Sequence, residues 1–222
     1  MRRLSAAIGA LLAFTAIARA EPPVAVVEDV QGKVTGAEFM DYVVPGQVIK
    51  LGPGSKIVLG YMKSCWRETI SGVGTVIVGS EQSAVHLADF KTEKVACDPT
   101  QAQRIGKELG ESAATVFRSL KDDPKKGPPP LVLHGLSPIV SIPERGKLVV
   151  ERIDVKGERY EVDLANAQPT GRRFYDLTRS NIALQPGGAY SIRLNSKFAA
   201  FVVDPNATPG AGPVIGRLVT LQ

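Results

Sequence analysis

Glycine and proline interrupt this chain so often that few segments are long enough to form anything but short strands. The 222 residues include 22 glycines and 16 prolines, and Pro45-Gly46 and the Gly-Pro-Gly at 52–54 mark tight turns. Between turns, apolar residues alternate with others, as Ile57, Leu59 and Tyr61 do along one face of their segment. We therefore expect a mainly β protein.

The first β region lies between residues 21 and 98. Its candidate strands are residues 24–30, 32–36, 47–51, 55–62, 75–79, 83–89 and 91–97. Many short strands separated by turn signals favour a sandwich, a barrel or a solenoid-like β module.

An amphipathic helix is expected over residues 99–120, followed by a stiff proline-rich linker over 121–130. Asp98 is a suitable N-cap, and Pro99 occupies the first helical position. The simpler interpretation packs this helix on the first β module. The alternative is a dimerisation or partner helix. The domain boundary falls in the linker.

The second β region spans residues 131–222 and has the size of an immunoglobulin-like sandwich. Its candidate strands are residues 138–142, 147–155, 159–164, 181–184, 189–194, 197–204 and 214–221. The expected fold is thus an N-terminal β module with one following helix, and then a β-sandwich.

Residues 1–20 have the order of features found in a secretory signal peptide. Two arginines precede an uncharged apolar run over 4–18, and Ala18-Arg19-Ala20 is a small-x-small cleavage site. An uncleaved anchor or a buried helix is the alternative, although 15 residues are too few to span a bilayer. We expect cleavage near Ala20 and a periplasmic or secreted chain with no transmembrane segment.

The net charge of +5 owes much to that leader. The leader holds three arginines and no acidic residue, so the remaining chain carries only +2. A nucleic-acid-binding protein needs a clustered basic patch, and we expect no nucleic-acid partner.

The two cysteines, Cys65 and Cys97, are expected to form a disulfide in an oxidising compartment. Two free thiols and a metal-binding pair are the alternatives. A zinc site needs two further ligands, and His86 is the only histidine between the cysteines. We therefore expect no metal.

No catalytic constellation stands out in the sequence. His86 lies in a candidate strand and His134 beside the linker, and both are more simply structural. Adjacent acids such as Glu28 and Asp29 would point to opposite faces of a strand and make poor acid–base partners. The sequence contains no Gly-x-Ser-x-Gly and no phosphate-binding loop leading into a helix. We expect neither enzymatic activity nor a cofactor.

Two aromatic features are candidates for a binding surface. Trp66 either packs on the disulfide in the core or serves as an exposed anchor. Arg172, Arg173, Phe174 and Tyr175 form a basic-aromatic cluster that would suit an anionic polymer. The alternative for the cluster is a solvated loop with a buried aromatic residue.

The segments VVEDVQGKVTG and VVPGQVIKLGPGSKIVLGY resemble the FecR-type periplasmic domain, and the similarity extends over residues 24–97. Gly32, the residues 46–49 and the residues 57–61 carry it. The resemblance implies an extracytoplasmic β module suited to envelope contacts. Signalling members of that family have a membrane helix before this domain, whereas a leader precedes it here, so their relay role is not implied.

The segment LQPGGAYSIRL at 184–194 resembles the corner of fibronectin type III and related sandwiches. Leu184, Pro186 and Tyr190 match that motif. The resemblance implies a structural tyrosine whose hydroxyl bonds to nearby backbone.

The sequence as a whole indicates a non-catalytic binding or scaffolding protein of the bacterial cell envelope, with an envelope protein or a cell-wall component as partner. The alternatives are a subunit of a signalling or export complex, and an envelope hydrolase that uses His86 or His134.

Overall fold

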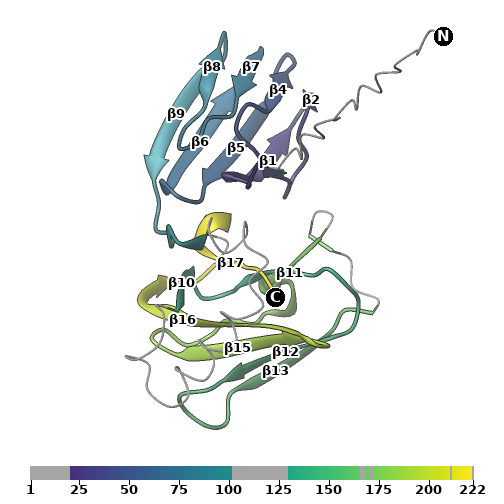
Figure 1. Ribbon diagram of the computed structural model, residues 1–222, viewed down its shortest axis with the longest axis vertical. Helices are drawn as coiled ribbons and strands as arrows, with labels where there is room; N and C mark the ends of the chain where they lie inside the picture. The colour runs from purple at the N-terminus through teal and green to yellow at the C-terminus, as the bar shows by residue number, and fades with distance from the viewer. Residues whose placement is uncertain (1–20, 102–129, 166–168, 171–172, 211, 222) are drawn as a thin grey trace, which may run out of the picture.

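The computed structural model describes residues 21–101, 130–165, 169–170, 173–210 and 212–221. Two β units follow one another along the chain, and the protein is mainly β as predicted (Figure 1). The predictions for the leader (1–20), for nearly all of the helix (99–120) and linker (121–130), and for Arg172 concern residues outside these ranges. The described residues include no helix long and apolar enough to cross a membrane.

The first unit consists of two packed sheets with strand orders β3-β1-β5-β6-β9 and β2-β4-β7-β8. The strands are β1 (Ala25–Gln31), β2 (Val34–Thr35), β3 (Tyr42–Val43), β4 (Val48–Leu51), β5 (Lys56–Tyr61), β6 (Trp66–Ser71), β7 (Gly74–Ile77), β8 (Ala84–His86) and β9 (Asp89–Lys94). All pairs within both sheets are antiparallel.

The alternation predicted for residues 55–62 sets the two faces of β5. Ile57, Leu59 and Tyr61 are fully buried in the core of the first unit. Val58 and Gly60 lie on the opposite face, which is turned toward the second unit. Both faces of this strand are therefore buried, one against the core of the first unit and the other toward the second unit.

The sequence pattern missed strand β6. It pairs with β5 and β9 in the middle of its sheet. Its inward residues include Glu68, which is completely buried, so a carboxylate interrupts the apolar period. Strands are predicted from the alternation of apolar residues, so a charged residue at a core position makes such a strand hard to predict.

The second unit also has two sheets, with strand orders β10-β16-β15-β12-β13 and β14-β11-β17. Its elements are β10 (Leu131–Gly135), β11 (Ile139–Ser141), β12 (Lys147–Arg152), β13 (Arg159–Asp163), β14 (Phe174–Asp176), the 3-10 turn η1 (Leu177–Ser180), β15 (Ala189–Leu194), β16 (Lys197–Thr208), the 3-10 turn η2 (Val214–Gly216) and β17 (Leu218–Val219). Both sheets supply side chains to one apolar core, separate from that of the first unit.

Two predicted strands of the second unit are wrong in part. Residues 181–184 follow η1 and form no strand, because Asn181 ends the turn in a left-handed conformation with φ of 53°. Residues 214–221 divide into η2 and the two-residue strand β17. Continuous apolar sequence does not distinguish a buried strand from a buried turn.

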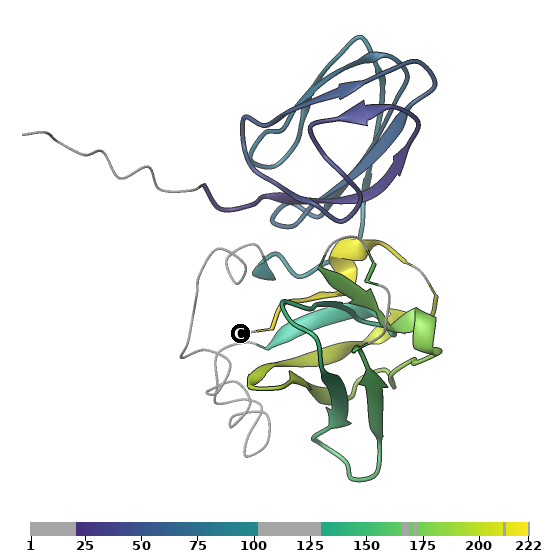
Figure 2. The same cartoon turned by 90° about the vertical axis from the view of Figure 1, so that its right-hand side faces the viewer.

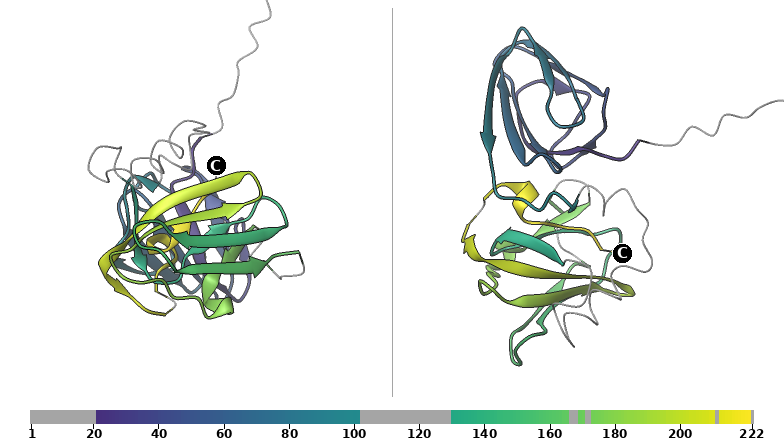
Figure 3. Two further views of the ribbon diagram at one scale, coloured as in Figure 1. Left: turned by 90° about the horizontal axis from the view of Figure 1, so that it is seen from below. Right: turned by 60° about the vertical axis from the view of Figure 1, so that its left-hand side comes forward.

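The chain passes from the first unit to the second just after β9 (Figure 3). Asp98 caps the next turn as predicted, since its carboxylate accepts the Thr100 N–H at 2.9 Å. The same side chain accepts the Val132 N–H at 3.0 Å, and the Gln101 amide donates to the Leu218 carbonyl. Asp98 and Gln101, at the start of the predicted helix, therefore contact the second unit.

Candidate binding site between the two β units

The two units meet across a third apolar cluster, which we call the seam. The first unit and the following chain supply Val26, Met40, Met62 and Cys97, and the second unit supplies Ile139, Phe174, Val214, Ile215 and Leu218. The turn η2 lies at the top of the second unit and faces the first (Figure 2). Burial of apolar surface from both sides joins the units.

Glycine allows the backbones to approach closely around η2. A Cβ atom on Gly60 would lie 2.6 Å from Cγ2 of Ile215, and one on Gly216 would lie 2.6 Å from the Ala96 carbonyl oxygen. Real side chains do not tolerate such distances to backbone or packed atoms. The seam thus depends on glycine at both positions.

A β-bulge in β1 aims Glu28 at the seam. The pairing of β1 with β5 shifts between Val27 and Asp29, so that Glu28 is the extra residue. Asp29 then pairs with Lys56 at 2.8 Å, on the same face of the sheet that Glu28 occupies. The expectation that Glu28 and Asp29 point to opposite faces is wrong, because the bulge breaks the two-residue period.

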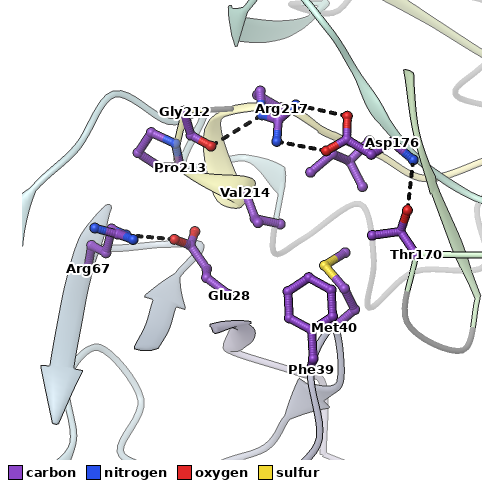
Figure 4. A pocket seen from close by; sticks show the side chains of 11 residues that line it. Glu28, Phe39, Met40, Arg67, Thr170, Asp176, Gly212, Pro213, Val214 and Arg217 are labelled. Atoms are coloured by element: carbon purple, nitrogen blue, oxygen red, sulfur yellow. Dashed lines mark hydrogen bonds and ion pairs between the residues drawn. The ribbon is translucent and has the colours of Figure 1, made fainter. Parts of the chain in front are cut away.

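Glu28 connects the two units directly. Its carboxylate accepts the backbone N–H of Ile215 at 3.0 Å. It also accepts the Arg67 Nε–H at 2.7 Å (Figure 4). Arg67 in turn donates to Glu93 at 2.7 Å. Burial raises the pKa of Glu28, while the bonds from Ile215 and Arg67 act in the opposite direction.

A second ion pair anchors η2 to its own unit. Arg217 is 3% exposed and holds Asp176 with two bonds of 3.1 and 3.0 Å (Figure 4). Its guanidinium also donates to the carbonyl oxygens of Ser137 at 2.8 Å and Gly212 at 3.3 Å. A two-pronged arginine–carboxylate pair fixes orientation as well as position, so η2 is held rigidly against the second unit.

A cavity of about 320 Å³ opens beside these groups. Both units line it: Glu28, Phe39, Met40, Arg67, Ile139, Thr170, Asp176, Gly212, Pro213, Val214 and Arg217. Phe39 is 39% exposed, and the Thr170 hydroxyl accepts the Asp176 N–H at 3.3 Å. The cavity therefore offers apolar surface beside matched positive and negative groups.

Two further hollows flank this cavity along the seam. One of about 300 Å³ shares Met40 with it and reaches Arg173 and Phe174. Another of about 240 Å³ shares Gly212, Pro213 and Arg217 with it. The three hollows therefore have lining residues in common where the two units meet.

The predicted disulfide is confirmed and lies at the seam. Cys65 and Cys97 are bonded, with Cα atoms 5.6 Å apart, and no free cysteine is found among the described residues. Cys65 follows β5, and Cys97 lies where the chain enters the second unit. The bond therefore ties the entry to the second unit to the end of β5.

Trp66 lies at the margin of the first core. Its ring is partly buried there, and the ammonium group of Lys94 sits 4.7 Å from the ring centre. The two histidines lie apart from each other: His86 is exposed on β8, and His134 lies 3.5 Å from Asp204 on the second unit. Neither histidine lines the cavity beside Glu28, whereas His134 lines the neighbouring hollow of about 240 Å³.

The basic-aromatic cluster does not form one exposed surface. Phe174 and Tyr175 are buried, and the hydroxyl groups of Tyr175 and Ser180 lie 2.7 Å apart. Phe174 stacks edge-on against Tyr42 of the first unit at 5.5 Å. Of the described residues of the cluster, Arg173 alone is exposed. Adjacent strand residues point to opposite faces, so Phe174 packs in the seam and Tyr175 in the core of the second unit.

Tyr190 has the structural position that its motif predicts. Its hydroxyl accepts the Gln185 N–H at 2.8 Å and donates to Glu158. Leu184 is buried beside it, and Pro186 lies in the exposed turn before β15. These residues stabilise the second core and do not belong to the cavity.

Sequence reasoning missed the residues that matter most at the seam. Glu28 carried one signal, an acid within the apolar run Val24–Val30, and Asp176 and Arg217 carried none. Each depends on a partner far away in the chain, such as Ile215 for Glu28 at a separation of 187 residues. Pattern reasoning over short windows does not detect such pairs.

Neither a metal-binding group nor a similar known protein identifies the chemistry of this site. No group of three or more His, Cys, Asp and Glu side chains placed to hold a metal occurs among the described residues. No model of a known protein family, no curated protein and no solved structure matches the chain.

Proposed function

We propose that this protein is a non-catalytic binding or scaffolding protein of the bacterial cell envelope. The leader-like residues 1–20 support export, and the Cys65–Cys97 disulfide is a bond typical of oxidising compartments. We further propose that the first unit is FecR-like and the second immunoglobulin-like. The turn pattern of the first and the Tyr190 corner of the second support this assignment.

The observation that carries the proposal is the cavity shared by both units. Its charged groups are already paired with one another, Glu28 with Arg67 and Asp176 with Arg217. Such a site has little net charge to attract an anionic polymer, whereas its apolar wall suits a side chain from another protein. We therefore favour a peptide segment of an envelope protein as the occupant, with Phe39 at the mouth of the site.

Site-specific cross-linking tests this proposal. A photoreactive residue replaces Phe39 at the cavity in the mature chain, and in a matched variant it replaces Val155, an exposed apolar residue in the β12–β13 turn of the second unit. Each variant is irradiated with solubilised envelope extract and, separately, with purified peptidoglycan. We expect one defined protein adduct from position 39 and none from position 155.

Equal labelling from both positions, or no adduct from position 39, would contradict a site at the seam. A product with peptidoglycan alone would retain the binding function but change the class of partner. A His86→Ala/His134→Ala variant should give the same adduct as the parent, because neither histidine lines this cavity. Loss of the adduct in that variant would favour the alternative of an envelope hydrolase that uses His86 or His134.

A further inference from the structure

Within the described part of the chain, no strand pairs with the outer edge of β9, the longest of the edge strands. β9 (Asp89–Lys94) is the last strand of its sheet and pairs with β6 on one side. All six of its residues are exposed, and the strand forms one margin of the first unit (Figure 1). The unpaired N–H and C=O groups of such an edge are a template for another strand.

Other described edge strands are shorter or better covered. β3 has two residues, and three of the five residues of β10 are buried. The exposed residues of β13 are occupied by ion pairs with β12, such as Arg159 with Glu151. β9 is therefore the edge at which strand addition meets the least obstruction.

Apolar side chains at one end of β9 face water. Phe90 is 38% exposed, and Leu87, in the turn before the strand, is 95% exposed. Leu87 also has a φ of 69°, a left-handed conformation that is uncommon for residues with a side chain. Leu87 and Phe90 therefore leave apolar surface next to the unpaired edge of β9.

We infer that β9 pairs antiparallel with β9 of a second copy of this chain, around a two-fold axis at Thr92. Residues that face each other across such a pair must lie on the same face of the joined sheet. With Thr92 opposite its own copy, Lys91 faces the partner's Glu93, and Glu93 faces the partner's Lys91. Phe90 then faces the partner's Lys94.

The charge pattern selects this register. A pair centred on Lys91 would place two lysines opposite each other and Asp89 opposite the partner's Glu93. A pair centred on Glu93 would place two glutamates together, and one centred on Phe90 would leave only three residues of each β9 in the ladder. Like charges directly opposite each other destabilise a sheet, and opposite charges stabilise it. The axis at Thr92 keeps five residues paired and matches every opposed pair of charges.

Charges on the face of the sheet that carries Gly60 and Arg67 continue this pattern. Glu28 binds Arg67, and Arg67 binds Oε1 of Glu93, at 2.7 Å each. No ion pair of Lys91 is found within the described part of the chain, and Glu93 remains 59% exposed. In the dimer, Lys91 of the partner completes a row of alternating charges across both copies. This inference does not depend on the function proposed for the seam.

The first test is the mass of the mature chain in solution. Sedimentation should show a concentration-dependent dimer, and Lys91→Glu should raise the dissociation constant at least about tenfold because two Glu–Glu contacts replace two attractive ones. Glu93→Lys should do the same, and the Lys91→Glu/Glu93→Lys double variant should regain dimerisation. Lys156→Glu, the same charge change in an exposed turn of the second unit, should leave the dimer intact.

The second test fixes the register. Cysteine in place of Thr92 should form an intermolecular disulfide on mild oxidation, since directly opposite Cβ atoms lie about 5 Å apart. Cysteine in place of Phe90 should not, because two such residues would be about 14 Å apart along the strands. Circular dichroism verifies that each variant is folded. A chain that stays monomeric at every concentration overturns the inference, and so does a double variant that fails to recover.

Discussion

The core of the first unit and the seam each contain a buried glutamate, and the two carboxylates differ in their hydrogen bonding. Glu68 in the first core accepts the Ser83 N–H at 2.9 Å through one oxygen, while its other oxygen has no hydrogen-bond partner. Glu28 at the seam accepts both an arginine and a backbone N–H of the other unit. Burial raises the pKa of both carboxyl groups.

The difference shows what a buried charge contributes in each place. In the first core, Glu68 is a source of instability that the surrounding apolar packing offsets. At the seam, the carboxylate is matched from both sides and fixes how one unit sits on the other. A buried charge is therefore tolerated in a core but acts as a connector at a seam, and this contrast can be tested by substitution.

The largest effect is expected from Arg217→Met. The change leaves the largely buried Asp176 side chain, 13% exposed, without its cation and removes the bonds that hold η2. We expect a loss of about 3–5 kcal/mol in the free energy of unfolding. The only tryptophan, Trp66, reports on the first unit, and circular dichroism reports on both. We expect the two signals to coincide in urea unfolding of the parent and to separate in the variant.

Asp176→Asn is the control for that cycle, since an asparagine keeps an acceptor for the Thr178 N–H at the start of η1. The double variant Arg217→Met/Asp176→Asn should lose less stability than the sum of the single variants. Strict additivity would mean that the pair does not act as a unit.

Removal of the disulfide should have the next largest effect. Cys65→Ser/Cys97→Ser opens a loop with a sequence separation of 32 residues and should lower the free energy of unfolding by about 3–4 kcal/mol. Because the bond ties the end of β5 to the entry of the second unit, we expect both spectroscopic transitions to move. A shift in only one of the two transitions would mean that the disulfide does not couple the unfolding of the two units.

Glu68→Gln should stabilise the first core by about 1 kcal/mol at neutral pH, since an uncharged amide costs less to bury than a carboxylate. Burial raises the pKa of Glu68 above its ordinary value of 4.5, so the folded protein holds this proton more tightly than the unfolded chain. The parent's free energy of unfolding should therefore fall as the pH rises from about 4.5 through the folded pKa. Urea unfolding followed by Trp66 should show a flatter pH profile for the variant.

Glu28→Gln should have the smallest effect, within about 1 kcal/mol at neutral pH. The amide oxygen can still accept the Ile215 N–H, and the lost attraction to the partly exposed Arg67 opposes the gain from removing a buried charge. The same urea titration gives the comparison. If Glu28→Gln stabilised the protein as much as Glu68→Gln does, the seam carboxylate would be no better matched than the one in the core.

Strands whose apolar residues alternate regularly could be predicted from the sequence. Segments in which a long-range contact places a charged residue in the interior could not. β5 followed from its alternation and Tyr190 from a short motif. β6 was hidden by Glu68, whose inward position violates the apolar period. Residues 214–221 looked like one strand because Val214, Ile215, Leu218, Val219 and Leu221 are all apolar and buried, although the first two belong to the turn η2.

What the sequence determined alone is local: where the chain turns, which segments extend, and that two cysteines in one chain can pair in only one way. What the tertiary structure decided is the seam. A bulge in β1 directs the Glu28 side chain toward the second unit, where it binds a residue 187 positions away. Glycine at positions 60 and 216 leaves room for the close packing around η2, and Arg217 holds η2 in place. Local structure depends on neighbours within a few residues, whereas a contact between units depends on where two independently formed surfaces happen to match.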